Sequence, residues 1–170
     1  MNRRNIFTLS AVTAMGLAML QDGAVAQEGT LKQQLVGTWT IVSDEITAPN
    51  GTKQQPYGAN PKGILILDAG GRYAVVRGRA DRPKLKSANR SEVTPQEFGA
   101  AALDFVAYFG TWSVHDADKT LTLRYEGALN PNYEGIEWKG TVSLTGDELK
   151  LTGTNAANGV RADQVYQRPR

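Results

Sequence analysis

The chain has 170 residues, the size of a single domain with a substantial core. Its 19 basic and 17 acidic residues nearly balance, so its charge indicates neither nucleic-acid binding nor binding to an anionic membrane. It contains no cysteine, which excludes disulfides, thiolate metal sites and a cysteine nucleophile.

The first 26 residues have the composition of an export signal. MNRRN is a positively charged start, and the apolar run IFTLSAVTAMGLAML is too short and too rich in small residues for a membrane span. Arg3-Arg4 fits either a twin-arginine signal or an ordinary secretion signal. Because Ala24-Val25-Ala26 offers a signal-peptidase site, we expect residues 1–26 to be cleaved. Residues 27–170 would then form one domain, periplasmic or secreted, with no membrane span.

The rest of the chain alternates between apolar and polar residues with period two, interrupted by turn sequences. The first expected strands are TWTIVSD, GILILD and RYAVVRGR, and the last two flank AGG as a hairpin. TWSVH, TLTLRYEG, IEWKGTVSL, LKLTG and VRADQVYQ follow, separated by turns such as DADK and TGDE. This predicts eight or nine antiparallel strands. Closure into a barrel would hide the sheet edges, and a two-sheet sandwich is the alternative.

One segment departs from the strand pattern. Thr94-Pro95-Gln96-Glu97 is a capping box with proline at the first helical position. The apolar residues that follow at spacings of three and four predict one amphipathic helix of about three turns. The polar segment before it, Ala80 to Ser91, is expected to be a mobile loop and a candidate lid. The residues expected on the apolar helical face are Phe98, Ala101, Ala102, Phe105 and Phe109.

The order of these segments resembles the bacterial and fungal lipocalin-like domain family over roughly residues 35–168. LVGTW, ending at Trp39, is similar to the Gly-x-Trp that opens the first strand of lipocalins, and PYG-x-x-P-x-G, AGGRY, YFGTW, KT-x-T and GD-x-L-x-L follow it. The resemblance implies an all-β fold: an antiparallel eight- to nine-stranded calycin-type barrel with one amphipathic helix and an internal cavity. It also implies that Trp39 packs near the closed barrel end with its indole N–H paired. The second GTW, ending at Trp112, is then a reuse of the same structural device.

His115 is the only histidine in the sequence and precedes the turn Asp116-Ala117-Asp118. If Trp112 faces inward, period two turns His115 outward, which favours a solvated turn residue over a catalytic base. A zinc site of three histidines is excluded, and the two aspartates lack the other ligands and the glycine of a calcium loop. The sequence therefore predicts no metal, no cofactor and no catalytic residue.

The chain departs from the family pattern at Leu123-Arg124, where relatives often carry two histidines. A guanidinium neither acts as a base at neutral pH nor replaces a metal ligand. Arg124 and Glu126 share one strand face, as do Glu137 and Lys139 on the next strand, so the four could form a ladder of opposite charges. The ladder faces either the cavity, with Arg124 holding a polar ligand group, or the solvent, because the neighbouring apolar residues form the better inward face.

The function expected from these patterns is an exported lipocalin-like protein that holds a small, mainly hydrophobic or amphipathic ligand in the barrel cavity. Two alternatives remain: an isomerase or cyclase acting on a hydrophobic substrate in the same cavity, and a cell-envelope interaction module with a filled barrel. Convergent polar groups in a ligand-sized cavity would favour the enzyme. The oligomeric state is left open. The residues expected to line the ligand site are Ile41, Leu65, Val75, Phe105, Leu123, Arg124, Tyr125 and Trp138.

Overall fold

The computed structural model describes residues 29–156 and 158–169. The expected signal peptide, residues 1–26, therefore lies outside the described residues. In chain order the elements are α1 (Leu31–Leu35), β1 (Gly37–Thr47), β2 (Lys53–Gln54), β3 (Lys62–Leu67), β4 (Arg72–Gly78), the 3-10 turn η1 (Arg90–Glu92), α2 (Pro95–Leu103), β5 (Phe105–His115), β6 (Thr120–Ala128), the 3-10 turn η2 (Pro131–Tyr133), β7 (Glu137–Thr145), β8 (Glu148–Thr154) and β9 (Arg161–Gln167).

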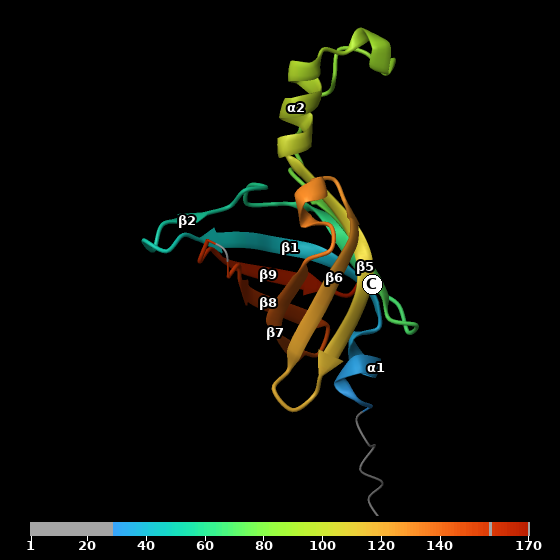
Figure 1. The fold of residues 1–170 in the computed structure, drawn as a ribbon, viewed down its shortest axis with the longest axis vertical. Helices are drawn as coiled ribbons and strands as arrows, with labels where there is room; N and C mark the ends of the chain where they lie inside the picture. Colours follow the sequence, from blue (N-terminus) through green and yellow to red (C-terminus); the bar gives the residue numbers. More distant parts are fainter. Residues whose placement is uncertain (1–28, 157, 170) are drawn as a thin grey trace, which may run out of the picture.

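Strands β1 and β3 to β9 form a closed antiparallel barrel, and β2 adds a short ninth strand. From β3 onwards each strand pairs with the next, and the pairing of β1 with β9 closes the barrel (Figure 1). Closure depends on the length of β1, whose first half pairs with β3 and whose second half pairs with β9. A bulge between Ile41 and Ser43, within the pairing of β1 with β9, bends the strand. The predicted barrel is confirmed, and the sandwich alternative is wrong.

The capping box at Thr94 starts α2 as predicted. The Thr94 hydroxyl accepts from the backbone N–H of Glu97 at 3.3 Å, and the Thr94 N–H donates to the Glu97 carboxylate at 2.9 Å. The helix ends at Leu103, however, so Phe105 and Phe109 lie on β5 and not on a helical face. β5 pairs with β4 from Phe105 onwards, which engages its backbone in the sheet. The spacing misled because apolar residues on both faces of a strand also produce intervals of three and four.

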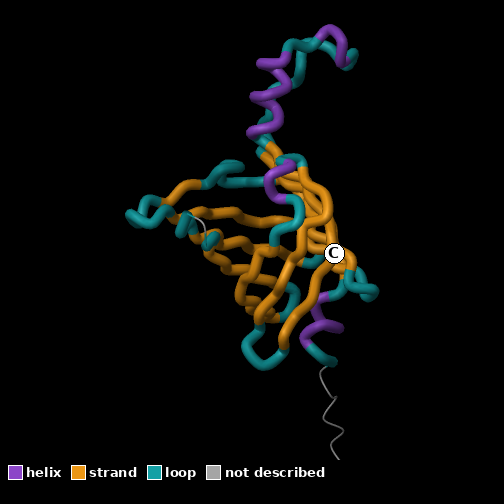
Figure 2. The backbone as a smooth tube through the Cα atoms, viewed as in Figure 1, coloured by secondary structure: helices purple, strands orange, loops and turns teal. Residues whose placement is uncertain are grey.

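Residues 79–104, which connect β4 to β5, form an arm that stands away from the barrel (Figures 1 and 2). The arm contains η1 and α2, and no residue of α2 is buried. Cations of the arm lie over aromatic rings instead: Arg90 lies over the ring of Phe98 in α2 at 5.5 Å, and Arg82 lies over the ring of Phe105, the first residue of β5, at 4.7 Å. The expected loop of residues 80–91 is part of this arm, and its action as a lid stays a prediction.

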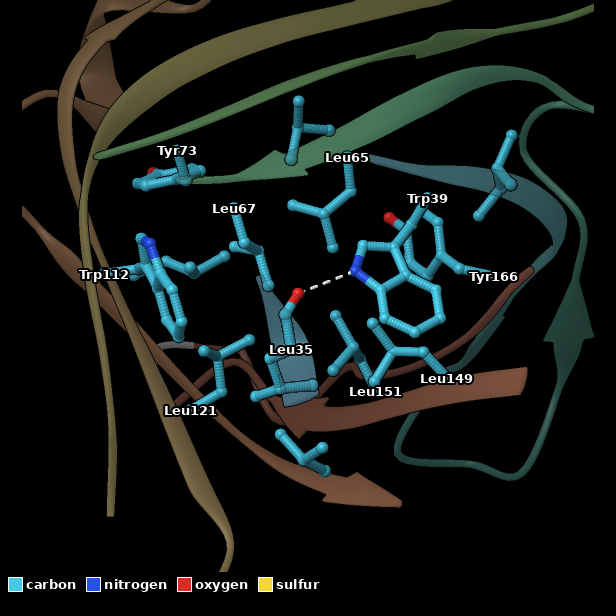
Figure 3. Close-up of a cluster of buried hydrophobic side chains, with 14 residues drawn as sticks. Leu35, Trp39, Leu65, Leu67, Tyr73, Trp112, Leu121, Leu149, Leu151 and Tyr166 are labelled. Atoms are coloured by element: carbon cyan, nitrogen blue, oxygen red, sulfur yellow. Dashed lines mark hydrogen bonds between the residues drawn. The ribbon is translucent and has the colours of Figure 1, made fainter. Parts of the chain in front are cut away.

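The barrel end next to α1, called the closed end below, is filled by side chains (Figure 3). Trp39 is completely buried, and its indole N–H donates to the carbonyl of Leu35 at 2.9 Å. Trp112 does the same toward the carbonyl of Asp68 at 3.0 Å. The expected structural role of both GTW tryptophans is therefore confirmed. The core consists of Leu35, Trp39, Ile41, Leu65, Leu67, Tyr73, Val75, Trp112, Leu121, Leu123, Val142, Leu149, Leu151 and Tyr166.

Helix α1 was not predicted from the sequence, although its start carries a signal. Thr30 and Gln33 form a capping box around the first turn. The helix places Leu35 under Trp39 and completes the closed end. Arg168, just after β9, lies over the Trp39 ring at 4.1 Å and donates to the carbonyls of Val36 and Gln34, which fixes the end of the chain against this helix.

Candidate functional site

The opposite end of the barrel interior, called the open end, carries polar side chains. Asp44 of β1, Arg77 of β4 and Gln164 of β9 point inward and are only 2%, 8% and 8% exposed. Arg77 has this orientation because it lies on the same strand face as Val75 and Tyr73, two and four residues before it. With two tyrosines, these residues form the interior polar cluster, defined as Asp44, Arg77, Tyr108, Gln164 and Tyr166.

The β1 bulge explains why the sequence did not reveal Asp44. Counting by two from Trp39 and Ile41 turns Ser43 inward and Asp44 outward. The bulge between Ile41 and Ser43 shifts this phase by one residue, so Asp44 becomes buried and Ser43 is half-buried. A one-residue irregularity thus moves a carboxylate from the solvent into the barrel.

Arg77 is at the centre of the interior polar cluster. Its Nε lies 2.6 Å from Oδ2 of Asp44, so the two side chains form a buried ion pair. Its Nη1 donates to the hydroxyls of Tyr108 at 2.9 Å and Tyr166 at 3.3 Å. The Tyr166 hydroxyl in turn donates to Oε1 of Gln164 at 3.3 Å. The guanidinium is therefore held from three strands besides its own.

Burial determines the protonation of this cluster. It raises the pKa of the Asp44 carboxyl above its ordinary value, although the Arg77 charge beside it acts in the opposite direction. Burial alone would lower the pKa of Arg77, but Tyr108, Tyr166 and Asp44 together raise it well above its usual range. Arg77 therefore stays charged, and Asp44 is the group of this pair that can take up a proton.

Four tyrosine rings run from the core to the rim of the open end. The ring centroids are 6.2 Å apart for Tyr73 and Tyr108, 4.9 Å for Tyr108 and Tyr125, and 6.0 Å for Tyr125 and Tyr133. The Tyr73 hydroxyl is buried without a hydrogen-bond partner among the described residues. Burial also raises the pKa of both Tyr73 and Tyr125, so both keep their hydroxyl protons at neutral pH.

A pocket of about 390 Å³ lies where the last turn of α2, the start of β5 and the η2 turn meet. Its volume is within the range of small-molecule sites, and its wall is largely apolar. Tyr108 belongs to this wall and also accepts the hydrogen bond from Arg77, so it links the pocket to the interior polar cluster. The pocket is lined by Ala102, Leu103, Phe105, Val106, Ala107, Tyr108, Leu129, Asn130, Pro131 and Tyr133.

The structure places the expected apolar and aromatic ligand-site residues in the pocket, in the tyrosine series and in or against the core. Phe105 lines the pocket. Tyr125 belongs to the tyrosine series, and Trp138 packs against the core where Gly140 and Gly153 leave room for its ring. The remaining apolar residues are buried within the core itself: Ile41, Leu65, Val75 and Leu123. Contact of any of these residues with a ligand stays a prediction.

Arg124 lies on the outer surface of the barrel, the second of the two placements considered above. It is exposed and stands opposite Glu137 in the pairing of β6 with β7. The expected four-charge ladder does not form, because Glu126 pairs instead with Arg72 of β4 at 2.7 Å. The buried guanidinium is Arg77, which the sequence analysis missed although it continues the alternation of Tyr73 and Val75.

His115 is exposed, and its Nδ1 lies 3.0 Å from a carboxylate oxygen of Asp118, as expected for a solvated turn residue. Within the described ranges, no group of three or more histidine, cysteine, aspartate or glutamate side chains could hold a metal ion. None of the helices in the described part of the chain has the length and apolar character needed to cross a membrane.

Three solved structures were compared with the chain. A redesigned β-barrel has 17% identity and a TM-score of 0.42, covering 82% of this chain and 95% of that chain. A de novo designed fluorescence-activating β-barrel has 12% identity and a TM-score of 0.42, covering 83% and 99%. A variant of the fluorescent protein UnaG has 15% identity and a TM-score of 0.37, covering 80% and 96%. These values are too low to assign a ligand.

No curated protein matches the chain. The family profile described as the lipocalin-like domain matches residues 36–169, nearly the whole of the barrel and its flanking segments. The family expected from the GTW, AGGRY and YFGTW segments is therefore the one found. The chain belongs to the lipocalin-like domain family.

Proposed function

We propose that this protein is an exported carrier that binds a small, mainly apolar molecule at the open end of its barrel. The proposal rests on one observation: Tyr108 lines the apolar pocket and also accepts a hydrogen bond from the buried Arg77. Because the Tyr108 hydroxyl accepts from Arg77, its own proton is left to donate to a ligand oxygen. Donation from a charged group strengthens the hydroxyl as a donor.

The charge of the cluster indicates the kind of oxygen acceptor. Arg77 is already compensated by Asp44 at 2.6 Å, so the pair carries no net charge toward the pocket. A ligand carboxylate would add an uncompensated buried charge, whereas a ketone, ester or phenol would only accept a hydrogen bond. The proposed ligand therefore has an apolar body against Phe105, Leu129 and Tyr133 and a neutral oxygen at Tyr108.

Export rests on the sequence of residues 1–26, with the expected cleavage before Gln27. The measurement is the intact mass of protein recovered from the periplasm, which should correspond to a chain beginning at Gln27. Recovery of the periplasmic protein with Met1 in place would contradict cleavage. Replacement of Arg3-Arg4 by Lys-Lys stops export only if the route is of the twin-arginine type.

Ligand binding is tested with two probes of the same shape, methyl 2-naphthyl ketone and 2-naphthoic acid, titrated by quenching of tryptophan fluorescence at neutral pH. The ketone should bind more tightly than the acid. Tyr108→Phe should weaken ketone binding about tenfold, equivalent to 1.4 kcal/mol. Tyr133→Phe, which also removes a hydroxyl from this pocket, is the matched control. Absence of ketone binding in the wild type, or equal binding by the wild type and Tyr108→Phe, would refute the proposal.

The hydrogen bond from the charged Arg77 to Tyr108 also favours a second candidate, an isomerase or cyclase acting on a hydrophobic substrate. The Tyr108 hydroxyl, strengthened as a donor by Arg77, would stabilise negative charge developing on a carbonyl oxygen of such a substrate. Extraction of molecules that co-purify with the protein separates the candidates. A carrier returns one compound, whereas an isomerase returns isomers of equal mass in a ratio that Tyr108→Phe changes.

A further inference from the structure

The outer surface of the barrel differs sharply between two groups of strands. Outward positions of β6, β7 and β8 are polar or charged, as at Arg124, Lys139, Thr141 and Lys150. By contrast, the adjoining middle parts of β3, β4 and β5 carry apolar residues at their outward positions. This region is called the apolar face and is defined by Ile64, Ile66, Ala74, Val76, Ala107 and Phe109.

The strand register brings these six residues together. Ile66 pairs with Ala74, which pairs with Phe109 on the next strand, and Ile64, Val76 and Ala107 form a parallel row beside them. The larger side chains stay open to solvent, at 38% for Ile64, 37% for Ile66, 36% for Val76 and 50% for Phe109. Cross-strand neighbours on one face lie within contact distance, so the six form one continuous surface.

The sequence of these strands is that of a sheet covered on both faces. GILIL, YAVV and FVAYF are unbroken apolar runs, whereas a strand with one solvated face alternates. The inward residues of these strands are already buried in the core, at Leu65, Leu67 and Val75. The arm, which could have covered the outer side, stands away from the barrel (Figure 1). A contiguous exposed apolar surface of this kind marks an interaction site.

The shape of the apolar face is complementary to itself. A hollow of about 520 Å³ lies on it, with Ala74, Val76, Ala107 and Leu129 in its wall. Phe109 stands at the same hollow, with its ring over Gly127, where a Cβ would lie only 2.5 Å from the ring. One surface thus offers both an exposed ring and a depression. In a two-fold contact the same patch serves both partners, so a ring and a depression on one patch can fill each other.

The charges at the rim of the apolar face also fit a second copy. Arg72 and Glu126 form an ion pair at 2.7 Å, and the rim also carries one further charge of each sign, Lys62 on β3 and Glu134 after η2. A second copy brings the same charges as the first, so only a balanced rim avoids repulsion between like charges. An anionic lipid surface would instead require a rim with excess positive charge.

We propose that a second copy of this chain packs on the apolar face to form a two-fold symmetric dimer, with Phe109 of each copy entering the hollow of the other. Its apolar centre and polar rim correspond to the usual anatomy of a protein interface. The hollow shares Ala107, Tyr108 and Leu129 with the proposed ligand pocket, so the two sites adjoin. The dimer is nevertheless tested without any ligand, so its failure and that of the proposed function are distinguishable.

The first test is sedimentation velocity on the purified chain over the micromolar range, with Val76 as the probed position. Wild type should sediment as a dimer, and Val76→Glu and Val76→Lys should each raise the dissociation constant at least about tenfold. An equimolar mixture of the two variants should dimerise again, because opposite charges then meet across the two-fold axis. Thr141→Glu, on the polar outer face of β7, is the matched control and should leave the dimer intact.

The second test uses the absence of cysteine from the chain. Val76→Cys should be cross-linked to a dimer by a short bis-maleimide, and Thr141→Cys should not. Both positions are exposed in the single chain, so neither substitution removes core packing. Sedimentation of wild type as a monomer throughout, or equal cross-linking at the two positions, would overturn the proposal. So would a monomer that binds phosphatidylcholine vesicles through Val76, because the occupant would then be lipid.

Discussion

At its closed end the barrel is filled by aliphatic and indole side chains, whereas at its open end it holds an ion pair, an amide and phenol rings. The two ends also differ in the hydrogen-bond partners of their buried polar atoms. Trp39 and Trp112 each give their single N–H to a backbone carbonyl that is already in place. Arg77 instead depends on side chains from β1, β5 and β9, and within the described part of the chain the hydroxyl of Tyr73 has no hydrogen-bond partner.

The two ends of the barrel therefore have different roles. Apolar burial is additive and tolerates small shifts, so the closed end contributes stability. A buried ion pair gains little over apolar packing of the same volume, and its groups are costly when separated. The open end therefore supplies hydrogen-bond donors in fixed orientations but contributes less stability than apolar packing would. Binding sites usually show this compromise. A ligand is expected at the open end, because at the closed end the indole N–H groups of Trp39 and Trp112 already donate to backbone carbonyls.

The largest effect is expected at the closed end. Trp39→Ala removes a fully buried ring and the hydrogen bond to Leu35, and should lower the free energy of unfolding by about 5 kcal/mol. Urea unfolding followed by circular dichroism measures this value. Trp39→Phe, which keeps part of the ring volume and loses the N–H, should cost clearly less. A loss below about 1 kcal/mol for Trp39→Ala would mean that the closed end does not carry the stability of the fold.

The next effect is at the open end. Arg77→Met leaves the Asp44 carboxylate buried without its counter-charge and should cost about 3 kcal/mol at neutral pH. The double variant Asp44→Leu, Arg77→Met replaces the pair by apolar side chains and should recover most of this loss. Equal stability of the single and the double variant would show that the two residues do not depend on each other.

The pH dependence of Arg77→Met has a definite sign. Burial raises the folded-state pKa of Asp44 above its unfolded value of 3.8, and removal of the Arg77 charge raises this pKa further. The folded state then binds a proton more tightly than the unfolded state. Protonation therefore stabilises the variant fully below pH 3.8, and this contribution is lost as the pH rises through the folded-state pKa. The stability deficit relative to wild type should thus shrink on acidification.

A smaller effect is expected for Tyr73→Phe, which removes a buried hydroxyl that has no hydrogen-bond partner among the described residues. Loss of such a group should change the stability by less than about 1 kcal/mol, toward higher stability, because no hydrogen bond is broken. Tyr166→Phe is the matched control, since its hydroxyl bonds to both Arg77 and Gln164 and its loss should destabilise. Destabilisation by Tyr73→Phe comparable to that by Tyr166→Phe would show that the Tyr73 hydroxyl has a partner in solution.

The closed end was far easier to predict from the sequence than the open end. The two GTW segments, the turn signals and period-two alternation indicated the barrel and the buried tryptophans, because these depend on local pattern. Asp44 was missed because a bulge changes the phase of β1, and bulge positions leave no clear local signal. Arg77 was missed although it lies on the same strand face as Tyr73 and Val75, because its partners Asp44, Tyr108 and Tyr166 come from other strands and are distant in the sequence.

The smallest effect is expected for Arg124→Leu. This substitution probes an arginine on the outer surface and is compared with substitution of the buried Arg77. Arg124 is exposed opposite Glu137, and exposed pairs of this kind contribute little. The substitution should change the free energy of unfolding by less than about 0.5 kcal/mol. It should also leave the affinities for methyl 2-naphthyl ketone and 2-naphthoic acid unchanged, whereas Arg77→Met should weaken ketone binding through Tyr108. Weaker binding of the acid alone to Arg124→Leu would place this guanidinium at the ligand and contradict the outer-surface position of Arg124.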